Sequence, residues 1–270
     1  MTGSIHRITS LTNPQVKAIR ALSQRKHRRA TGTFLAEGLK LVIDGLDAGW
    51  PIETFLFSES IRDQAAIGAA SVKARAAGAA VLEVTDAILE KIARRDNPQM
   101  VIGVFHQQTE TIEALLNVPN GLFVALEGIK DPGNLGTIIR TAEAAGADAV
   151  ILIGETTDPF GLEAVRASMG SLFHMKLARL SVSDFVDQRP QWPGRIVGTH
   201  LSGTTDFRRA LIDRPLTILM GNEQAGLPER LAELCNDLVI IPMRGKADSL
   251  NLAVATGIVL FQASLGPSGS

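Results

Sequence analysis

The residues that could do chemistry lie in three polar segments, each placed just after an apolar run. The segments are 134–140 (Asn-Leu-Gly-Thr-Ile-Ile-Arg), 221–227 (Gly-Asn-Glu-Gln-Ala-Gly-Leu) and 241–251, where Ile-Pro-Met is followed by Ser-Leu-Asn. The candidate catalytic side chains within them are Asn134, Arg140, Glu223, Ser249 and Asn251. Because a parallel α/β sheet binds ligands in loops at the carboxyl ends of its strands, we expect the three segments to form one pocket.

Each of these residues also has an ordinary structural interpretation. Arg140 either extends its charge to solvent or holds an anion, and a fixed guanidinium suits an RNA phosphate. Glu223 lies between two glycines, where a carboxylate is commonly exposed or serves the first turn of the next helix. Ser249 and Asn251 also fit the N-terminus of a helix. The combination of the three segments, rather than any single residue, indicates a site.

Residues 241–243 offer main-chain groups in place of side-chain chemistry, because the proline at their centre cannot donate a hydrogen bond. Main-chain donors and acceptors of this kind suit the edge of an adenine ring. The glycines near residue 134 do not form the Gly-x-Gly-x-x-Gly fingerprint of dinucleotide binding. A nucleotide-dependent oxidoreductase is therefore disfavoured.

The composition bounds the class of protein. The chain has 270 residues, 45% of them hydrophobic, and a formal net charge of −1, which allows two domains and excludes a protein that is basic throughout. Aromatic residues make up only 4%, which disfavours RNA recognition by a stacking surface. The single cysteine suits a reducing compartment, and no signal peptide or membrane span is evident. We expect a cytoplasmic protein without a metal, since the histidines other than His200 lack metal-ligand spacing.

The charge is unevenly placed along the chain. The first 36 residues contain seven Lys or Arg and no Asp or Glu. Four of these cations are clustered, at Arg25, Lys26, Arg28 and Arg29. The cluster is either the solvated end of a helix or a surface that contacts phosphates.

The apolar periodicity predicts two α/β domains joined by a linker. Residues 1–107 predict a small sandwich with strands at 33–36, 53–57, 80–84 and 100–105 and helices at 14–29, 39–48, 64–77 and 86–94. Residues 108–120 are polar and predict the linker. Residues 121–266 predict strands at 122–126, 149–153, 175–177, 195–199, 216–220 and 238–241, with helices at 135–145, 162–169, 183–188, 228–235 and 250–263. Strands separated by helices in this way favour a parallel sheet covered on both faces.

The three segments resemble the motifs of the SpoU/TrmH branch of the SPOUT RNA methyltransferases. Those motifs have the forms Asn-x-Gly-x-x-x-Arg, Gly-Asn/Ala-Glu-x-x-Gly and Ile-Pro-Met … Ser-Leu-Asn, and their order and spacing match. Residues 165–170 (Val-Arg-Ala-Ser-Met-Gly) look like a further family signature. The resemblance covers residues 120–264 strongly. Residues 32–38 and 97–99 are more weakly similar to the family's N-terminal substrate-binding domain, with Met100 where many relatives have Gly.

The resemblance implies a fold and an activity. It implies a C-terminal parallel-sheet SPOUT domain with a deep trefoil knot and a small N-terminal α/β RNA-binding domain. It also implies a homodimer that transfers the methyl group of S-adenosylmethionine to a ribose 2′-hydroxyl of structured RNA, with ribosomal RNA favoured. The residues that would bind the cofactor are Thr199, His200, Gly221, Asn222, Ile241, Met243 and Leu250.

The resemblance also implies roles for the catalytic candidates. Arg140 is the family's proposed activator of the hydroxyl; because a guanidinium stays protonated, we expect it to hold the neighbouring phosphate and stabilise developing negative charge. Glu223 would orient Arg140 or accept the proton, while Asn134, Ser249 and Asn251 position the sugar and the cofactor. With an RNA substrate in view, phosphate contact becomes the favoured interpretation of the Arg25–Arg29 cluster.

Three other functions remain open at this point. One is methylation of transfer RNA, and another is methylation of a base, as in other SPOUT branches. The third is a non-catalytic RNA-binding or ribosome-assembly protein. The intact Arg140, Glu223 and Asn251 disfavour this third alternative, because a pure binding protein has no need to keep them.

Overall fold

A computed structural model describes residues 5–94, 98–200, 203–210, 213–246 and 248–265. The chain forms two compact units, of which unit 1 contains residues 1–107 and 158–173 and unit 2 contains residues 108–157 and 174–270. Residues 158–173 thus belong to unit 1, although they lie within the predicted domain 121–266. Within the described ranges, no helix combines the length and apolarity needed to cross a membrane.

Unit 1 is built on a five-stranded mixed sheet in the order β1-β4-β3-β5-β2. Its strands are β1 (His6–Ile8), β2 (Thr33–Glu37), β3 (Ile52–Ser58), β4 (Ala80–Val84) and β5 (Val101–His106). Its helices are α1 (Pro14–Ala21), α2 (Arg25–Thr31), α3 (Leu39–Asp47), α4 (Ala65–Ala76), α5 (Asp86–Ala93) and α8 (Leu162–Ala167), with short 3-10 turns η1 (Glu59–Ile61) and η2 (Ser171–Phe173). The strand β1 was not expected from the sequence.

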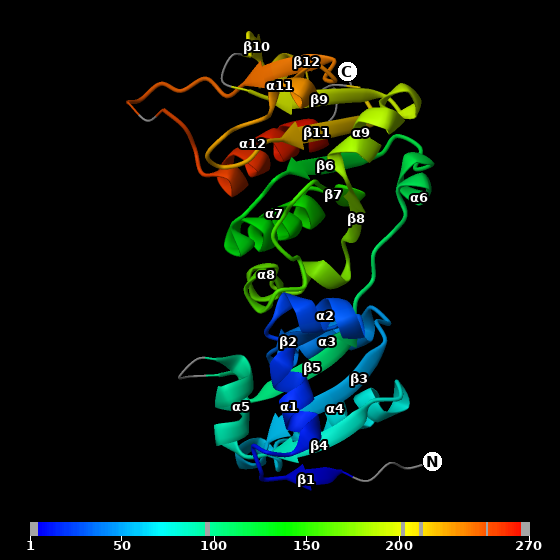
Figure 1. Ribbon diagram of the computed structural model, residues 1–270, viewed down its shortest axis with the longest axis vertical. Helices are drawn as coiled ribbons and strands as arrows, with labels where there is room; N and C mark the ends of the chain where they lie inside the picture. The colour runs from blue at the N-terminus through cyan, green and yellow to red at the C-terminus, as the bar shows by residue number, and fades with distance from the viewer. Residues whose placement is uncertain (1–4, 95–97, 201–202, 211–212, 247, 266–270) are drawn as a thin grey trace. The chain divides into compact units, whose positions relative to one another are not determined.

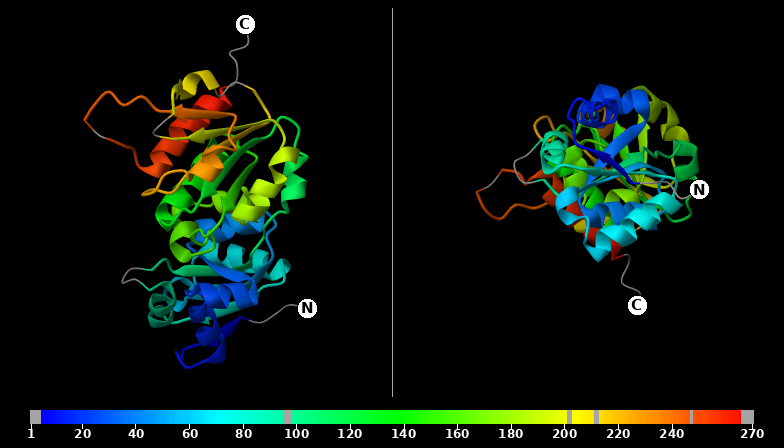
Figure 2. Two further views of the ribbon diagram at one scale, coloured as in Figure 1. Left: turned by 45° about the horizontal axis from the view of Figure 1, so that its top comes forward. Right: turned by 90° about the horizontal axis from the view of Figure 1, so that it is seen from below.

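Helices cover both faces of this sheet, as the right view of Figure 2 shows for the blue α1 and the cyan α4. On the α1 and α5 side, an aliphatic cluster joins Val16 and Ile19 of α1 to Ile88 and Leu89 of α5 and to the strands. The other side contains aromatic side chains, where Phe34 lies within ring contact of other members of the unit. This two-sided core agrees with the predicted α/β sandwich.

The helix predicted at 14–29 is in fact two helices. The first ends at Ala21 and the second begins at Arg25. The turn between them is stabilised by Arg28, whose Nη1 donates to the Leu22 carbonyl oxygen at 2.8 Å. The sequence pattern could not show this break. The hydrogen bond that stabilises the turn comes from Arg28, a charged side chain that the apolar periodicity places on the solvent-exposed face.

Residues 158–173 pack along β2, which is the edge strand of the sheet. The guanidinium of Arg28 donates to Asp158 Oδ2 from Nε at 2.9 Å and from Nη2 at 2.7 Å, and both residues are buried. Arg166 forms an ion pair with Glu37 at the end of β2. An edge strand offers unpaired backbone groups to other chains, so this covering segment protects it.

Unit 2 is a seven-stranded, fully parallel sheet in the order β10-β12-β9-β11-β6-β7-β8. Its strands are β6 (Leu122–Glu127), β7 (Ala149–Ile153), β8 (Lys176–Leu180), β9 (Arg195–Thr199), β10 (Thr205–Asp206), β11 (Leu216–Met220) and β12 (Asp237–Ile240). Its helices are α6 (Ile112–Leu116), α7 (Pro132–Ala144), α9 (Val182–Gln188), α10 (Phe207–Ala210), α11 (Glu229–Ala232) and α12 (Leu252–Ser264), with a 3-10 turn η3 (Arg189–Gln191). The predicted parallel α/β architecture is confirmed, and the knot stays a prediction.

Helices α7 and α12 lie side by side on one face of this sheet (Figure 1), and α6, α9 and α11 contribute to a core on the other face. The α7 and α12 contact is close, because a Cβ at Gly257 would lie 3.3 Å from Thr141 Cγ2. Strands β12, β9, β11 and β6 are consecutive neighbours in the sheet. Their carboxyl ends, and the loops that follow them, therefore lie next to one another.

Candidate active site

The loop after β11 is a tight turn that only glycine permits. Asn222 and Gly226 exchange backbone hydrogen bonds at 3.1 and 2.9 Å, which closes the turn. A Cβ at Gly221 would overlap the backbone of Gly226 and Leu227. The Asn222 Oδ1 accepts from the amides of residues 224 and 225, and its Nδ2 donates to the Gly128 carbonyl oxygen at 2.8 Å. The turn is thereby fixed to the loop that follows β6.

The carboxylate of Glu223 receives hydrogen bonds from both sides of that junction. Its Oε1 accepts from the Asp131 amide at 3.4 Å and from Asn134 Nδ2 at 3.3 Å. Its Oε2 accepts from the Lys130 amide at 3.4 Å and from Asn222 Nδ2 at 3.2 Å. These distances are long, and the carboxylate is exposed, so the side chain keeps lone pairs that a substrate could reach.

The third segment joins the same network through Asn251. Its Nδ2 donates to Asn134 Oδ1 at 2.9 Å, and its Oδ1 caps α12 by accepting from the amides of Ala253 and Val254 at 2.9 and 3.3 Å. Asn134 is in turn held by the Asp131 cap of α7, whose Oδ1 accepts from its amide at 2.6 Å. A chain of amide and carboxylate groups thus runs from Asn251 through Asn134 to Glu223.

Arg140 and Ser249 stand outside this chain of hydrogen bonds. Arg140 lies farther along α7 and is exposed, and its guanidinium makes no ion pair or hydrogen bond within the part of the chain that the structure describes. In particular, it does not contact Glu223 of its own chain, which was one of the two expected roles for that carboxylate. Ser249 is exposed two residues before the Asn251 cap. Arg140 is therefore available to a negatively charged group from outside the chain.

The expected cofactor residues lie at the neighbouring strand ends. Thr199 ends β9, and its Oγ1 donates to Met220 Sδ at 3.4 Å; the next amide, of His200, donates to the Val239 carbonyl oxygen at 3.0 Å. Gly221 follows β11, and Ile241 follows β12. The segment from β12 to α12, drawn as an orange loop in Figure 1, extends away from the sheet.

The segment between β12 and α12 leaves main-chain groups without partners among the described residues. Between described residues, no backbone hydrogen bond is made by residues 242–246 or 248–250, so their amides and carbonyls are available to the edge of a base. Met243 and Leu250 are exposed apolar side chains, at 38% and 36%. Exposed apolar groups beside free main-chain donors and acceptors are what a flat aromatic ligand with a polar edge requires.

Two further groups near the strand ends were not predicted from the sequence. Burial raises the pKa of the Glu127 carboxyl at the end of β6, while the positive charges of Arg230 and Lys130 oppose that rise. The ammonium of Lys130 donates to the Glu155 carbonyl oxygen at 2.7 Å, which ties the loops after β6 and β7 together. The position of both residues directly after an apolar strand was the available signal.

The basic cluster of α2 is not uniform. Lys26 and Arg29 are exposed and can face solvent, whereas Arg25 is half-buried and its Nε is enclosed by the protein. Arg28 is only 5% exposed and pairs with Asp158, which corrects the expectation that it contacts a phosphate. A guanidinium whose Nε, Nη1 and Nη2 are occupied inside the protein has a structural role.

Residues 121–261 match the SpoU rRNA Methylase family, and residues 13–103 match the MRM3-like substrate binding domain. The chain belongs to the SpoU rRNA methylase family. It is 30% identical over 254 residues to the 23S rRNA (guanosine(2553)-2'-O)-methyltransferase RlmP of Bacillus subtilis, an alignment that covers 94% of this chain and 97% of RlmP.

Solved structures agree with this assignment. An rRNA methyltransferase from Sinorhizobium meliloti, crystallised with AdoMet bound, is 50% identical with a TM-score of 0.89, covering 97% of this chain and 98% of that one. The SpoU methyltransferase AviRb of Streptomyces viridochromogenes, also in complex with AdoMet, is 29% identical with a TM-score of 0.84, covering 93% and 97%. This SpoU family member is thus an RNA ribose 2′-O-methyltransferase that uses S-adenosylmethionine, as the three motifs predict.

Proposed function

We propose that this enzyme methylates a ribose 2′-hydroxyl of 23S ribosomal RNA, and that the hydrogen-bonded loops after β6, β11 and β12 form its active site. The observation that supports the site is the continuous connection from Asn251 through Asn134 to Glu223. These residues are separated by up to 117 positions in the chain, so no local structural need explains why they meet. We choose 23S RNA because the names of RlmP and of other relatives give 23S rRNA as their substrate.

When bound, S-adenosylmethionine supplies a methyl group already activated for transfer, so the protein has to position the sugar and assist the loss of its proton. The main chain after β9, β11 and β12 holds the donor, with Met243 and Leu250 against its apolar parts. Thr199, His200, Gly221, Asn222 and Ile241 shape this pocket, most of them through backbone groups rather than side chains.

Arg140 binds the phosphate next to the target ribose and stabilises negative charge that develops on the attacking oxygen. Its exposure and its lack of a partner among the described residues support this role, because a guanidinium held by the protein would not be free to bind RNA. It does not act as a base, because a guanidinium remains protonated.

Glu223 has two roles open to it in this mechanism. As an acceptor of four N–H groups it holds the loop after β6 in place, and as an exposed carboxylate it could accept the proton of the 2′-hydroxyl. Asn134 and Asn251, whose side-chain amides are hydrogen-bonded to each other, orient the sugar. Ser249, just before the N-terminus of α12, provides a further contact. The pH dependence of a Glu223→Gln variant separates the two roles.

The protein acts as a homodimer through the outer face of α12. Val254, Ile258, Phe261 and Leu265 recur at helical spacing and are 52%, 37%, 49% and 74% exposed. Such an apolar stripe on a helix favours burial against a second copy of the chain. Because Arg140 lies on α7, next to α12, the same association would bring a second subunit to the active site, and sedimentation of an Ile258→Glu, Phe261→Glu variant as a monomer would support it.

Four finer points belong to this proposal. The C-terminal chain threads a trefoil knot around the cofactor loops, and the enzyme acts in the cytoplasm. The substrate-binding domain is 1–107, the linker 108–120 and the methyltransferase domain 121–266, of which residues 158–173 pack with unit 1. Arg25, Lys26 and Arg29 contact RNA phosphates, whereas Arg28 holds their helix in place.

The function is tested with tritiated S-adenosylmethionine and ribosomal RNA from cells that lack this gene. We expect tritium in 23S RNA and none in transfer RNA, at one ribose. Alkaline hydrolysis should leave the labelled linkage intact, because a 2′-O-methyl group blocks its cleavage. Label in transfer RNA alone, or label released with a methylated base, would contradict the proposed substrate, and cofactor binding without transfer would identify a non-catalytic protein.

A further inference from the structure

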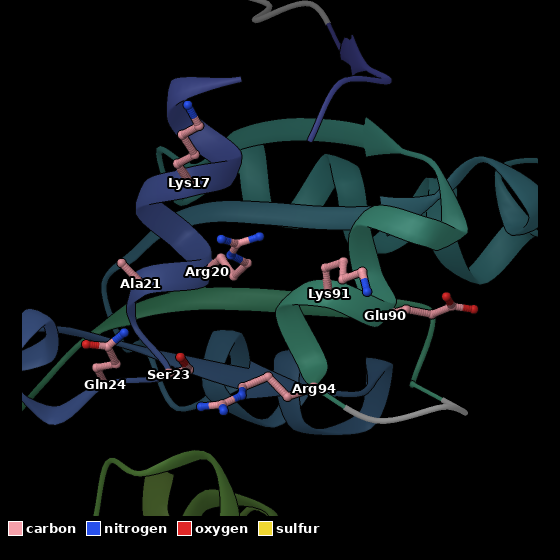
Figure 3. Close-up of a pocket in the computed structure, with 8 residues that line it drawn as sticks. All are labelled: Lys17, Arg20, Ala21, Ser23, Gln24, Glu90, Lys91 and Arg94. Atoms are coloured by element: carbon pink, nitrogen blue, oxygen red, sulfur yellow. The ribbon is translucent and has the colours of Figure 1, made fainter. Parts of the chain in front are cut away.

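Unit 1 contains a groove of about 790 Å³ between α1 and α5, and half of the residues that line it are cations. Its lining consists of Lys17, Arg20, Ala21, Ser23, Gln24, Glu90, Lys91 and Arg94. Figure 3 shows the guanidinium of Arg20 extending from α1 toward α5, and that of Arg94 extending from the end of α5 toward α1. Four cations and one carboxylate thus share one surface on a protein whose net charge is −1.

The packing of the two helices explains why these charges gather. Val16 and Ile19 of α1 and Ile88, Leu89 and Ile92 of α5 enter the same aliphatic cluster, which fixes the helices side by side. Their polar faces must then lie together on the outside. Residues 17 and 20 of α1 are three positions apart and share a helix face, while Lys91 lies in the last turn of α5 and Arg94 is the left-handed cap that ends it.

The cations of the groove differ from most others in unit 1. Elsewhere Arg7, Lys40, Arg62 and Lys73 each form an ion pair with a carboxylate. Within the described residues, Lys17, Arg20, Lys91 and Arg94 form none, and all four are exposed. Cations favour the C-terminal end of a helix, which accounts for Arg20, for Lys91 and for the α5 cap residue Arg94, but not for Lys17. It also does not explain why four cations from two helices, none in an ion pair with another described residue, line one groove.

The lining also indicates what kind of polyanion fits. It contains no aromatic side chain, so it offers nothing on which an unpaired base could stack. It does offer Ser23 and Gln24, whose polar side chains can bond to ribose hydroxyls and phosphates. Cations with hydroxyl and amide groups, and without aromatics, suit the sugar-phosphate backbone of a duplex.

We propose that the groove between α1 and α5 binds the backbone of a double-stranded RNA stem that lies apart from the methylated nucleotide. This groove is distinct from the basic cluster of α2. The proposal rests on the proposed function, because the bound RNA is taken to be the substrate. The stem contact would add affinity and orientation without taking part in methyl transfer. Its loss should therefore change RNA binding and leave the chemistry at saturating RNA unchanged.

The test replaces the four cations in the full-length protein, as Lys17→Gln, Arg20→Gln, Lys91→Gln and Arg94→Asn. Asparagine is chosen at Arg94 because that residue has φ +57°, a conformation that Asn tolerates. A matched control removes the same charge from the same unit at Arg7, Lys40, Arg62 and Lys73, each replaced by Gln. A Lys17→Gln, Arg20→Gln variant serves if the fourfold variant fails to fold.

Binding is measured to a short RNA duplex, to one of its strands alone and to phosphatidylserine vesicles, and methyl transfer is measured with ribosomal RNA. We expect the groove variant to bind the duplex at least 10-fold more weakly than the control. The plot of log K against log salt should be shallower by roughly 2 to 4, because each lost phosphate contact contributes about 0.9. KM for RNA should rise, with kcat and cofactor affinity within about twofold.

Other outcomes overturn the inference. Duplex binding equal to that of the control, or an unchanged salt dependence, would show that the groove does not contact the backbone. A loss confined to the single strand or to vesicles would assign the groove to a different ligand. If the protein binds the duplex through these residues but methylates no RNA, the proposed function is refuted and the inference about the groove still holds.

Discussion

The two units hold their charged groups in opposite ways. In unit 1, the guanidinium of Arg28 is buried, with Nε and Nη2 donating to Asp158 and Nη1 donating to the Leu22 carbonyl oxygen, so the protein itself neutralises its charge. In unit 2, Arg140 is exposed without a partner among the described residues, and the exposed carboxylate of Glu223 is held only by hydrogen bonds of 3.2–3.4 Å. The buried Arg28 stabilises the fold of unit 1, whereas the exposed Arg140 is able to bind a ligand.

The difference shows that the environment, and not the residue type, decides what an arginine does. A buried pair is costly to break because the remaining charge stays in a medium that solvates it poorly. An exposed, unpaired guanidinium contributes little to stability and can be removed without unfolding the protein. Substitutions in the two units should therefore separate cleanly into effects on activity and effects on stability.

The largest expected effect is on activity. Arg140→Ala should lower methyl transfer at least about 10³-fold, which corresponds to about 4 kcal/mol, because a preorganised charge at the reacting oxygen is lost. Its cofactor affinity and unfolding temperature should stay close to those of the wild type. Tritium transfer and calorimetric titration with S-adenosylmethionine measure the two. Arg209→Ala, which removes an exposed cation from the same unit, is the control and should be fully active.

The next effect is on stability. Arg28→Met should lower the free energy of unfolding of unit 1 by about 3–5 kcal/mol, because it leaves Asp158 buried without its partner. The fluorescence of Trp50, in a Trp192→Phe background, follows unit 1 alone during denaturation in urea. Lys40→Met, which breaks the exposed pair with Asp44, should cost less than about 1 kcal/mol. Equal losses in the two variants would contradict the idea that burial makes the Arg28–Asp158 pair costly to break.

An intermediate effect is expected where one residue serves both structure and site. Asn251→Ala should destabilise the protein by about 1 kcal/mol through loss of the α12 cap, and should also reduce methyl transfer. Asn251→Asp keeps the capping oxygen but cannot donate to Asn134. It should retain stability and still lose activity. If it is as active as the wild type, the bond between Asn251 and Asn134 has no catalytic importance.

The smallest effect concerns the single cysteine. Burial raises the pKa of the Cys235 thiol to about 12, and the nearby Arg189 opposes this only partly. Since the folded pKa is raised, the folded protein holds the proton more tightly, and stability should fall as the pH rises from 9.0 toward about 12. At pH 8 the native thiol should react with iodoacetamide about 10³-fold more slowly than in urea, because the thiolate is the nucleophile. Comparable rates would show that the thiol is accessible.

Much of this arrangement could be predicted from the sequence, for reasons that differ by element. The strands at 149–153, 195–199 and 216–220 were predicted with their observed bounds, because each has a largely apolar centre that is buried on both faces. The convergence of the three motifs followed from their positions after such runs. Short strands such as β1 and β10 were missed, since three or two residues carry no periodicity.

The roles of individual cations could not be predicted in the same way. Arg28 meets Asp158 across 130 positions, and its neighbours Lys26 and Arg29 have the same charge but remain exposed. Likewise, Lys17 and Arg20 became part of a groove only when α1 was placed beside α5. The polar partners of a side chain depend on the tertiary structure, whereas the apolar pattern of a strand is local.

The segment 158–173 has a consequence for how this protein can be divided. The chain leaves unit 1 after residue 107, builds β6 and β7 of unit 2, returns to unit 1, and leaves it again after residue 173. A single proteolytic cut or stop codon therefore cannot release either unit intact. A truncation at residue 107 would expose the edge of β2 and would remove Asp158, the partner of Arg28. The two units therefore have to be expressed as one chain.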